Sequence, residues 1–189
     1  MTKNFIECYL NDVKSIADKI SVDEIYNFQQ HIDQVKKSKG RLFFLGVGGS
    51  SANASHAVND FRKILGIESY AITDNASELT ARINDDGWDT CFSNWLKISN
   101  LSSNDAIVIF SVGGGSETTS RNIVKAIDYA KEVNSKILSI VSRNGGYSLQ
   151  KSDSCILIPV LNDDTITPHA EEWQGILWHL IVTSLKDKK

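Results

Sequence analysis

Two pairs of side chains in this sequence are suited to proton transfer or to metal binding. His56 and Asp60 lie four residues apart in a segment that is predicted to be helical, so both side chains lie on one face, one turn apart. Glu171 and His179 lie in a second predicted helix, where a spacing of eight residues leaves them about 80° apart on one broad face. Histidine titrates near neutral pH, so the set suits acid–base catalysis. It equally suits a zinc site with mixed nitrogen and oxygen ligands, and the sequence leaves both roles open.

Each pair also has a plainer interpretation. His56 and Asp60 taken alone fit the polar surface of a helix, and His179 lies within an apolar stretch where histidine is usually part of the core. The presence of a second acid–histidine set in the same chain favours a functional site.

Glycine is the one residue type with an uneven distribution. Of the 12 glycines, 8 fall in three clusters, which are Gly46, Gly48 and Gly49, then Gly113 to Gly115, then Gly145 and Gly146. Clustered glycines indicate places where the backbone itself approaches another group closely.

The first two clusters carry serines, and each lies between a predicted strand and a predicted helix. Helix N-termini offer free N–H groups and a positive dipole end, which favour phosphate. The first cluster is neither G-x-G-x-x-G nor a P-loop, because Ser51 stands at the third glycine position and no Lys-Ser or Lys-Thr follows. Ser120 is expected to cap the helix that it precedes, whereas the third cluster is expected to form only a strand-to-helix turn. The residues predicted to bind the phosphorylated end are Gly48, Gly49, Ser50, Ser51, Ser111, Gly113, Gly114, Ser116 and Ser120.

Alternating strands and helices would position these loops. Short apolar runs predict strands at 41–46, 69–73, 105–110, 136–141 and 154–159, and helical periodicity predicts helices at 50–65, 120–133 and 171–185, with another helical stretch from 79. Such alternation predicts an α/β fold, a doubly wound parallel sheet flanked by helices, with ligands at the carboxyl ends of the strands. Pro159 and Pro168 are expected to bracket a loop before the last helix.

The first 39 residues have a different pattern, with isoleucines at helical spacing. Ser21 followed by Glu24 is a capping-box signature, so two amphipathic helices are predicted. We expect a single domain over residues 1–189 with an N-terminal helical arm over residues 1–39, folded either onto its own domain or onto a partner subunit.

Composition excludes several classes of protein. The chain has 189 residues, 41% of them hydrophobic, and a net charge of −3, so no broad basic field is available for nucleic acid. No apolar run is long enough for a membrane span, and no signal peptide is expected. Three cysteines without metal-site spacing predict reduced thiols. These features predict a cytoplasmic protein with neither nucleic-acid nor membrane partners.

Taken together, these motifs resemble the phosphoheptose isomerases, which are sugar isomerase (SIS) domain proteins. The resemblance rests on Gly46-x-Gly-Gly-Ser50, on His56 followed by an acid one turn later, on Asn84-Asp85, on the serine–glycine loop from Ser111 and on His179, and it extends over nearly the whole chain. It implies conversion of sedoheptulose 7-phosphate to glycero-manno-heptose 7-phosphate. It also implies a homotetramer with active sites at subunit interfaces, and no organic cofactor.

By the resemblance, Asp60 is the catalytic carboxylate and His179 the catalytic histidine. Zinc, where present, would be held by His56, Asp60, Glu171 and His179. Phosphate would be held by Ser50, Ser111 and Ser120, and Asn84, Asp85 and Glu171 would also contact substrate.

This chain departs from the family pattern at the expected site. The family has Glu at the position of Asp60 and Gln at the position of Glu171. The loop 111–120 is longer than the family's S-T-S-G-N-S and lacks the hydroxyls at its second and third positions, and 167–171 replaces an Arg-Ile-Gln-Glu pattern. The alternatives are therefore an isomerase of another phosphosugar and a non-catalytic sugar-phosphate-binding SIS module.

Overall fold

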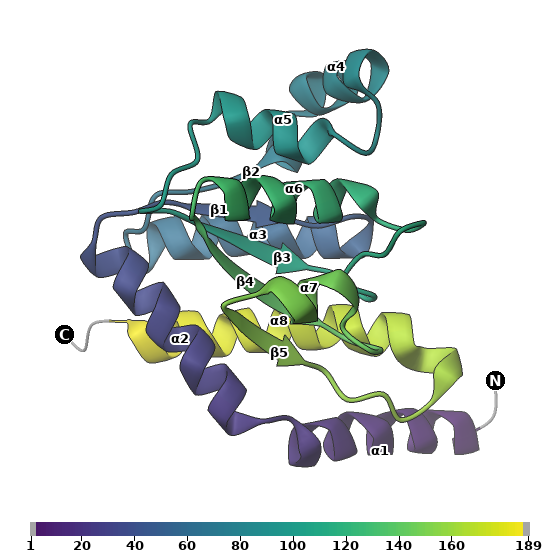
Figure 1. The fold of residues 1–189 in the computed structure, drawn as a ribbon. Coiled ribbons are helices and arrows are strands. Elements are labelled where there is room, and N and C mark those ends of the chain that lie inside the picture. Colours follow the sequence, from purple (N-terminus) through teal and green to yellow (C-terminus); the bar gives the residue numbers. More distant parts are fainter. Residues whose placement is uncertain (1–2, 187–189) are drawn as a thin grey trace.

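The computed structural model describes residues 3–186, and its centre is a parallel sheet of five strands (Figure 1). The strands are β1 (Leu42–Leu45), β2 (Ser69–Ala71), β3 (Ala106–Phe110), β4 (Lys136–Val141) and β5 (Ser154–Leu157). Their order is β2-β1-β3-β4-β5, and every neighbouring pair is parallel. The predicted doubly wound fold is confirmed, with its topological switch point between β1 and β3.

The strands β1 and β3 are apolar throughout because both faces of the sheet are covered. Successive residues of β1 point to opposite sides, so Leu42 and Phe44 lie in one hydrophobic cluster and Phe43 and Leu45 in the other. β3 and β4 divide their side chains in the same way. This two-sided burial fixes the register, since a shift by one residue would exchange the two cores.

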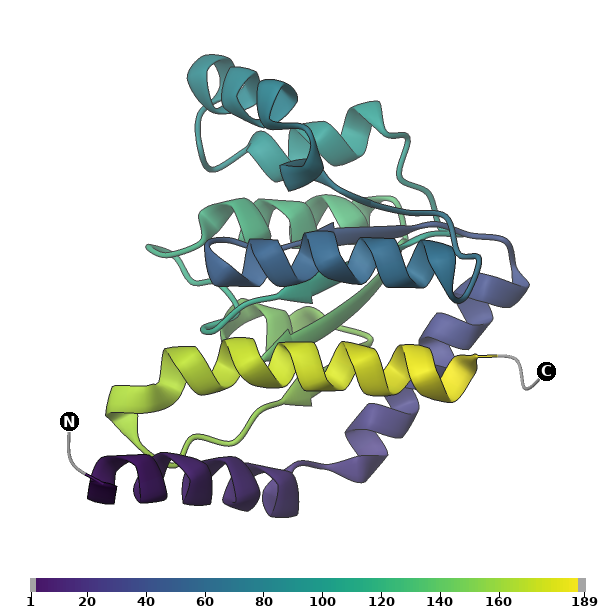
Figure 2. The ribbon, with the colours of Figure 1, turned by 180° about the vertical axis from the view of Figure 1, so that it is seen from behind.

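Helices form a layer on each face of the sheet (Figures 1 and 2). One layer holds α2 (Val22–Lys37), α3 (Gly49–Lys63) and α8 (Ile166–Leu185), with α1 (Lys3–Lys19) beside it. The other layer holds α5 (Cys91–Ile98), α6 (Arg121–Glu132) and α7 (Gly146–Lys151), with α4 (Ala76–Asp86) at its edge. Two short 3₁₀ turns, η1 (Ile72–Asp74) and η2 (Asp163–Thr165), precede α4 and α8. Among residues 3–186, no helix is long and apolar enough to cross a membrane.

The N-terminal arm contacts its own chain through both of its helices. The Ser21 side chain caps α2 by accepting a hydrogen bond from the Glu24 N–H at 3.2 Å. The Glu24 carboxylate does not complete the capping box but accepts a bond from the Leu157 N–H, which ties α2 to β5. α1 touches α8 through Tyr9, whose hydroxyl donates to Glu172 at 2.6 Å. The burial of Tyr9 and this bond raise its pKa to about 12.

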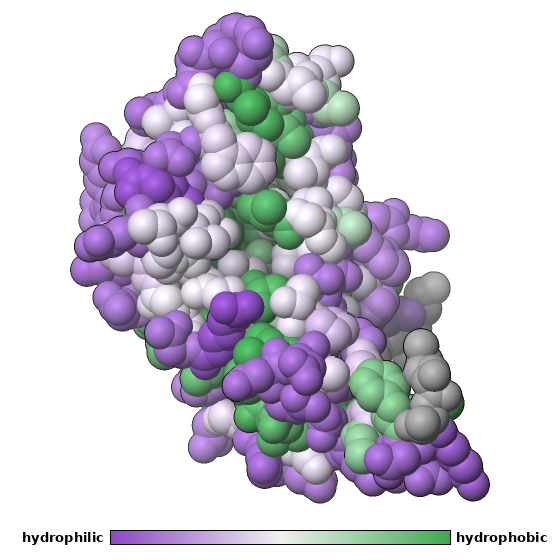
Figure 3. Space-filling model, turned by 90° about the vertical axis from the view of Figure 1, so that its right-hand side faces the viewer, coloured by the Kyte–Doolittle hydropathy of each residue, from purple (hydrophilic) through white to green (hydrophobic). Residues whose placement is uncertain are grey.

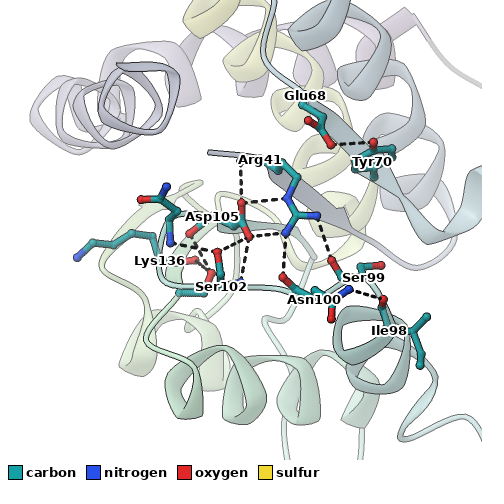
Figure 4. A network of polar contacts seen from close by, with 11 residues as sticks. Arg41, Glu68, Tyr70, Ile98, Ser99, Asn100, Ser102, Asp105 and Lys136 are labelled. Carbon is teal, nitrogen blue, oxygen red and sulfur yellow. Dashed lines mark hydrogen bonds and ion pairs between the residues drawn. The ribbon is translucent and has the colours of Figure 1, made fainter. Parts of the chain in front are cut away.

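The amino ends of β1 and β3 are joined by a buried ion pair (Figure 4). Asp105 is 2% exposed, and it accepts bonds from the Arg41 backbone N–H and guanidinium and from the Ser102 N–H and hydroxyl. Burial raises the pKa of this carboxyl, but these hydrogen bonds outweigh it and hold the pKa below its usual value. The pair thus joins β1 and β3 at their amino ends, opposite to the carboxyl ends where ligands bind in such sheets.

Three elements differ from the predictions. The helix α8 begins at Ile166, so the expectation that Pro168 lies in a loop is wrong. Proline is tolerated there because first-turn residues need no N–H partner. The short helices α5 and α7 were not predicted, and they contain only 8 and 6 residues.

Candidate active site

A cavity of about 380 Å³ opens at the carboxyl ends of β1, β3 and β4. Its position follows from the fold, because loops that leave neighbouring strands in opposite directions leave a crevice at the switch point. The space-filling view of this side shows hydrophobic residues in a broken band among hydrophilic ones (Figure 3). The lining residues are Val47, Ser50, Ser111, Val112, Gly113, Gly115, Ser116, Thr119, Ser120, Arg143 and Asn144.

The second and third glycine clusters pack against each other, backbone to backbone. A Cβ added at Gly146 would meet the carbonyl oxygens of Gly113 and Gly115, and one added at Gly114 would meet the backbone of Gly145. Hydrogen bonds join the two segments, because the Tyr147 N–H donates to Gly115 and the Ser148 N–H to Gly114, each at 2.9 Å. The third cluster therefore holds the cavity loop in place, which goes beyond the simple turn that was predicted.

Two of the serines in the cavity wall have no hydrogen-bond partner among the described residues. Ser50 is 1% exposed, and its buried hydroxyl is unpaired. A buried unpaired hydroxyl is costly, so it indicates a partner that is supplied by a ligand. Ser120 occupies the N-cap position of α6 but makes no side-chain cap bond, so the predicted cap is wrong. Its backbone is left-handed, with φ of 52°, and this leaves the hydroxyl free.

The other predicted hydroxyls are engaged within the chain. Ser111 accepts a bond from the Gly114 N–H, and Ser116 accepts from the N–H groups of the two threonines that follow. Ser51 donates to the Gly48 carbonyl at 2.7 Å and is absent from the cavity wall. Gly48 has φ of 64°, and this positive φ lets the chain turn from β1 into α3.

A second feature lies farther along α3, where its outer face meets α8. Donor atoms of His56, Asp60 and His179 all lie within 4.8 Å of one another. The His179 Nδ1 atom lies 2.8 Å from the Gly175 carbonyl, which can only accept, so Nδ1 carries a proton. In the neutral imidazole the Nε2 lone pair is then free, and Nε2 lies 3.8 Å from the Asp60 carboxylate.

This group fits a divalent metal by its chemistry. Two imidazoles and one carboxylate match the three protein ligands of catalytic zinc sites, and the Gly175 carbonyl orients His179 as an outer hydrogen-bond partner would. The structure brings together three of the four predicted ligands. Glu171 lies outside the group.

The Glu171 carboxylate packs instead against the first turn of α3. It lies so close to the bare Cα of Gly49 that any side chain there would collide with it. Asn53 fixes this part of α8, because its side-chain amide donates to the Glu171 carbonyl at 2.8 Å and to Gln174 at 3.2 Å. A carboxylate beside a helix N-terminus is favourable, and the Glu171 carboxylate lies at the N-terminal end of α3, beside Gly49.

Asn84 and Asp85 are placed away from both features. They lie exposed in the last turn of α4, where the Asn84 amide donates to Asp85 at 2.8 Å. Within this chain they do not line the cavity. Their role in substrate binding stays a prediction.

The sequence analysis missed one charged residue of the cavity wall. Arg143 lies two residues after the end of β4 and two residues before Gly145. A cation beside a glycine cluster, at the carboxyl end of a predicted strand, was a usable signal. The third cluster by itself predicts only a turn, so the glycine pattern alone does not single out Arg143.

Comparison with known proteins decides the family. The chain is 30% identical over 178 residues to a protein of Thermoplasma volcanium named "Probable phosphoheptose isomerase", and the match covers 92% of this chain and 86% of that one. The chain belongs to the phosphoheptose isomerase family. A phosphoheptose isomerase of Campylobacter jejuni is 26% identical over 195 residues, covering 98% of this chain and 92% of the other. No family model matches.

The fold agrees with this family assignment. A phosphoheptose isomerase structure from Neisseria gonorrhoeae superposes with a TM-score of 0.84 at 24% identity, covering 97% of this chain and 99% of that one. This member of the phosphoheptose isomerase family is therefore an isomerase with the SIS fold, and its substrates are phosphosugars.

Proposed function

We propose that this phosphosugar isomerase converts sedoheptulose 7-phosphate to glycero-manno-heptose 7-phosphate through an enediol. One observation carries the proposal. The helix α3 begins at the cavity, and Ser50 in its first turn lines the wall. His56 and Asp60 lie farther along the same helix, close to His179. Ser50 and His56 are six residues apart, or roughly 9 Å along the helix axis. An open-chain sugar phosphate can therefore place its phosphate in the cavity and its carbonyl end at the histidine group.

Asp60 is the proposed base. It takes the proton from C1 of the ketose and returns it to C2, so that the C=O bond moves from C2 to C1. One carboxylate oxygen accepts a bond from the Asn59 amide at 2.8 Å, and the other faces His179. Proton transfer by positioned groups typically contributes about 10²- to 10⁴-fold.

His179 is the proposed partner that moves the proton between the two oxygens. O1 loses a proton and O2 gains one in this conversion, so one imidazole nitrogen can serve both atoms. The free Nε2 lone pair of the neutral tautomer suits this role, because Nδ1 is held by the Gly175 carbonyl. Most of the remaining rate enhancement would come from positioning and from stabilising the enediolate.

We propose zinc as an additional component, held by His56, Asp60 and His179. When bound, the metal would supply Lewis-acid polarisation of the substrate oxygens. Coordination would occupy Asp60, so base and ligand roles compete at that side chain. Activity that remains complete after chelation, with metal content measured, would remove zinc from the proposal.

We also propose a cytoplasmic homotetramer with active sites at subunit interfaces. Exposed apolar side chains on α1, which include Phe5, Ile6 and Leu10, support burial against another subunit. In such an assembly the exposed Asn84 and Asp85 would be available to the site of a neighbouring subunit. Three free cysteines agree with a reducing compartment. Light scattering coupled to gel filtration measures the assembly directly.

The variants Asp60→Asn and His179→Gln test the reaction. Each should retain sugar-phosphate binding by calorimetry but lose turnover and the exchange of the C1 proton in D₂O. Glu132→Gln, which removes an exposed carboxylate at the end of α6, is the matched control and should behave as wild type. Unchanged turnover in either active-site variant would overturn that residue's assignment. A panel of phosphosugars from pentose to heptose identifies the substrate by kcat/KM.

A further inference from the structure

Within residues 3–186, the wall of this cavity carries a single charged side chain. Among the described residues that line it, Arg143 is the only cation, and there is no carboxylate. The adjoining cavity of about 510 Å³ on the other side of the loop 113–116 has mixed charges from Glu117, Arg121 and Lys125. The first cavity therefore presents a cation with no carboxylate beside it, whereas the cations of the adjoining cavity share their wall with Glu117.

Arg143 is also the one arginine that has no hydrogen bond or ion pair among the described residues. The chain has five arginines, and four are bound internally. Arg41 pairs with Asp105, Arg82 with Glu78 and Arg121 with Asp89, and Arg62 donates to the Ser69 carbonyl. Arg143 is exposed and has no hydrogen bond or ion pair within residues 3–186. Its five N–H donors remain available to a ligand.

The backbone at Arg143 gives an independent indication. Five non-glycine residues in the described chain have positive φ. Lys39, Asn100 and Asn134 each follow the C-cap of a helix, where a left-handed residue is common. The remaining two, Ser120 (φ 52°) and Arg143 (φ 54°), are not explained in this way, and both line the cavity. Strained conformations that cluster at one cavity are typical of ligand sites.

The neighbouring contacts hold this conformation and direct the side chain. The Ser142 N–H donates to the Val112 carbonyl at 3.0 Å, and the Gly145 N–H donates back to the Ser142 carbonyl at 2.9 Å. The Arg143 side chain crosses Gly113, since its Cδ would lie 3.9 Å from a Cβ added there. The Arg143 side chain therefore runs beside the loop that also bears the free Ser120 hydroxyl, and both residues line the same cavity.

We propose that Arg143 binds the phosphate group of the substrate and sets the enzyme's preference for its dianionic form. Guanidinium matches two phosphate oxygens at once, which a lysine cannot do. This inference deepens the proposed function, on which it rests for the substrate class. It assigns a specificity-determining residue to the phosphate end, separate from the proton-transferring group on α3 and α8.

Kinetics and binding of three variants test the assignment. Arg143→Gln should raise KM for the phosphosugar about 10- to 100-fold, as loss of a charge-assisted bond implies, and change kcat much less. Arg143→Lys should recover only part of this loss. Lys125→Gln removes the same charge from the adjoining cavity, and its KM should match that of the wild type. If Arg143→Gln leaves KM unchanged, or Lys125→Gln raises it equally, the assignment is overturned.

The pH dependence of binding of a phosphate monoester, glycerol 3-phosphate, supplies a readout that a merely structural role would not move. The second pKa of a phosphate monoester lies near 6, so wild-type affinity should rise as the pH increases from about 5 to 7. Arg143→Gln should flatten this rise, and a retained rise would count against the proposal. Arg143-dependent phosphate binding without heptose phosphate turnover would refute the proposed substrate alone. Turnover with KM independent of Arg143 would refute the residue assignment alone.

Discussion

Replacing Gly146 with alanine should destabilise the protein and impair phosphosugar binding together. The new Cβ would collide with the carbonyl oxygens of Gly113 and Gly115, which are backbone atoms and cannot rotate away. Gly146 also has φ of 52°, where an L-residue costs about 1–2 kcal/mol. Overpacking adds about 1–3 kcal/mol, so the free energy of unfolding should fall by about 2–5 kcal/mol.

Gly66→Ala is the matched control for this substitution. Gly66 has φ of 69°, but a Cβ there would meet nothing within 4 Å. It therefore carries only the backbone cost of about 1–2 kcal/mol. For a domain of this size each kcal/mol lowers the melting temperature by about 2–4 °C, which predicts a loss of about 4 °C for Gly66→Ala and about 10 °C for Gly146→Ala.

Calorimetric melting curves and steady-state kinetics measure both effects. Gly146→Ala should raise KM for the phosphosugar, because relieving the collision moves the loop 113–115 that lines the cavity. Gly66→Ala should leave KM unchanged. Equal losses of melting temperature in the two variants, or an unchanged KM in Gly146→Ala, would refute the conclusion that the two glycine clusters hold the cavity in shape.

Three further predictions concern separate parts of the molecule. Asp105→Asn should cost about 3 kcal/mol at pH 7, because it leaves the Arg41 guanidinium without its buried partner. The folded pKa of Asp105 is lowered, so its contribution is present above about pH 4 and lost as the pH falls through the folded pKa. Denaturant titrations should therefore show a steeper loss of stability in acid for wild type than for the variant. Gly175→Ala, with open space in the interior of α8, should stabilise the protein by about 0.5–1 kcal/mol, and a lower melting temperature would contradict this. Ser50→Ala removes a buried unpaired hydroxyl, so the ligand-free protein should keep or gain stability while KM rises about 2- to 10-fold; a fall in stability with unchanged KM would mean that the hydroxyl is structural.

The sequence by itself determined the elements and the local part of the site. Apolar runs such as 42–45 predict strands because both sides of such a strand must be buried. His56 and Asp60 share a face through helical geometry alone, and clustered glycines reveal close backbone approach without revealing what approaches. The switch point, and thus the edge that carries the cavity, follows from strand alternation and handedness.

The tertiary structure decided which loops and helix faces meet. His179 reaches Asp60 only because α8 packs beside α3, and Gly146 closes on Gly113 only because β4 lies next to β3. Glu171 resembled a fourth metal ligand in sequence, yet packing places its carboxylate on Gly49. Local pattern encodes burial and backbone conformation within one element. Contacts between elements depend on strand order, register and helix packing, and no short stretch of sequence contains these.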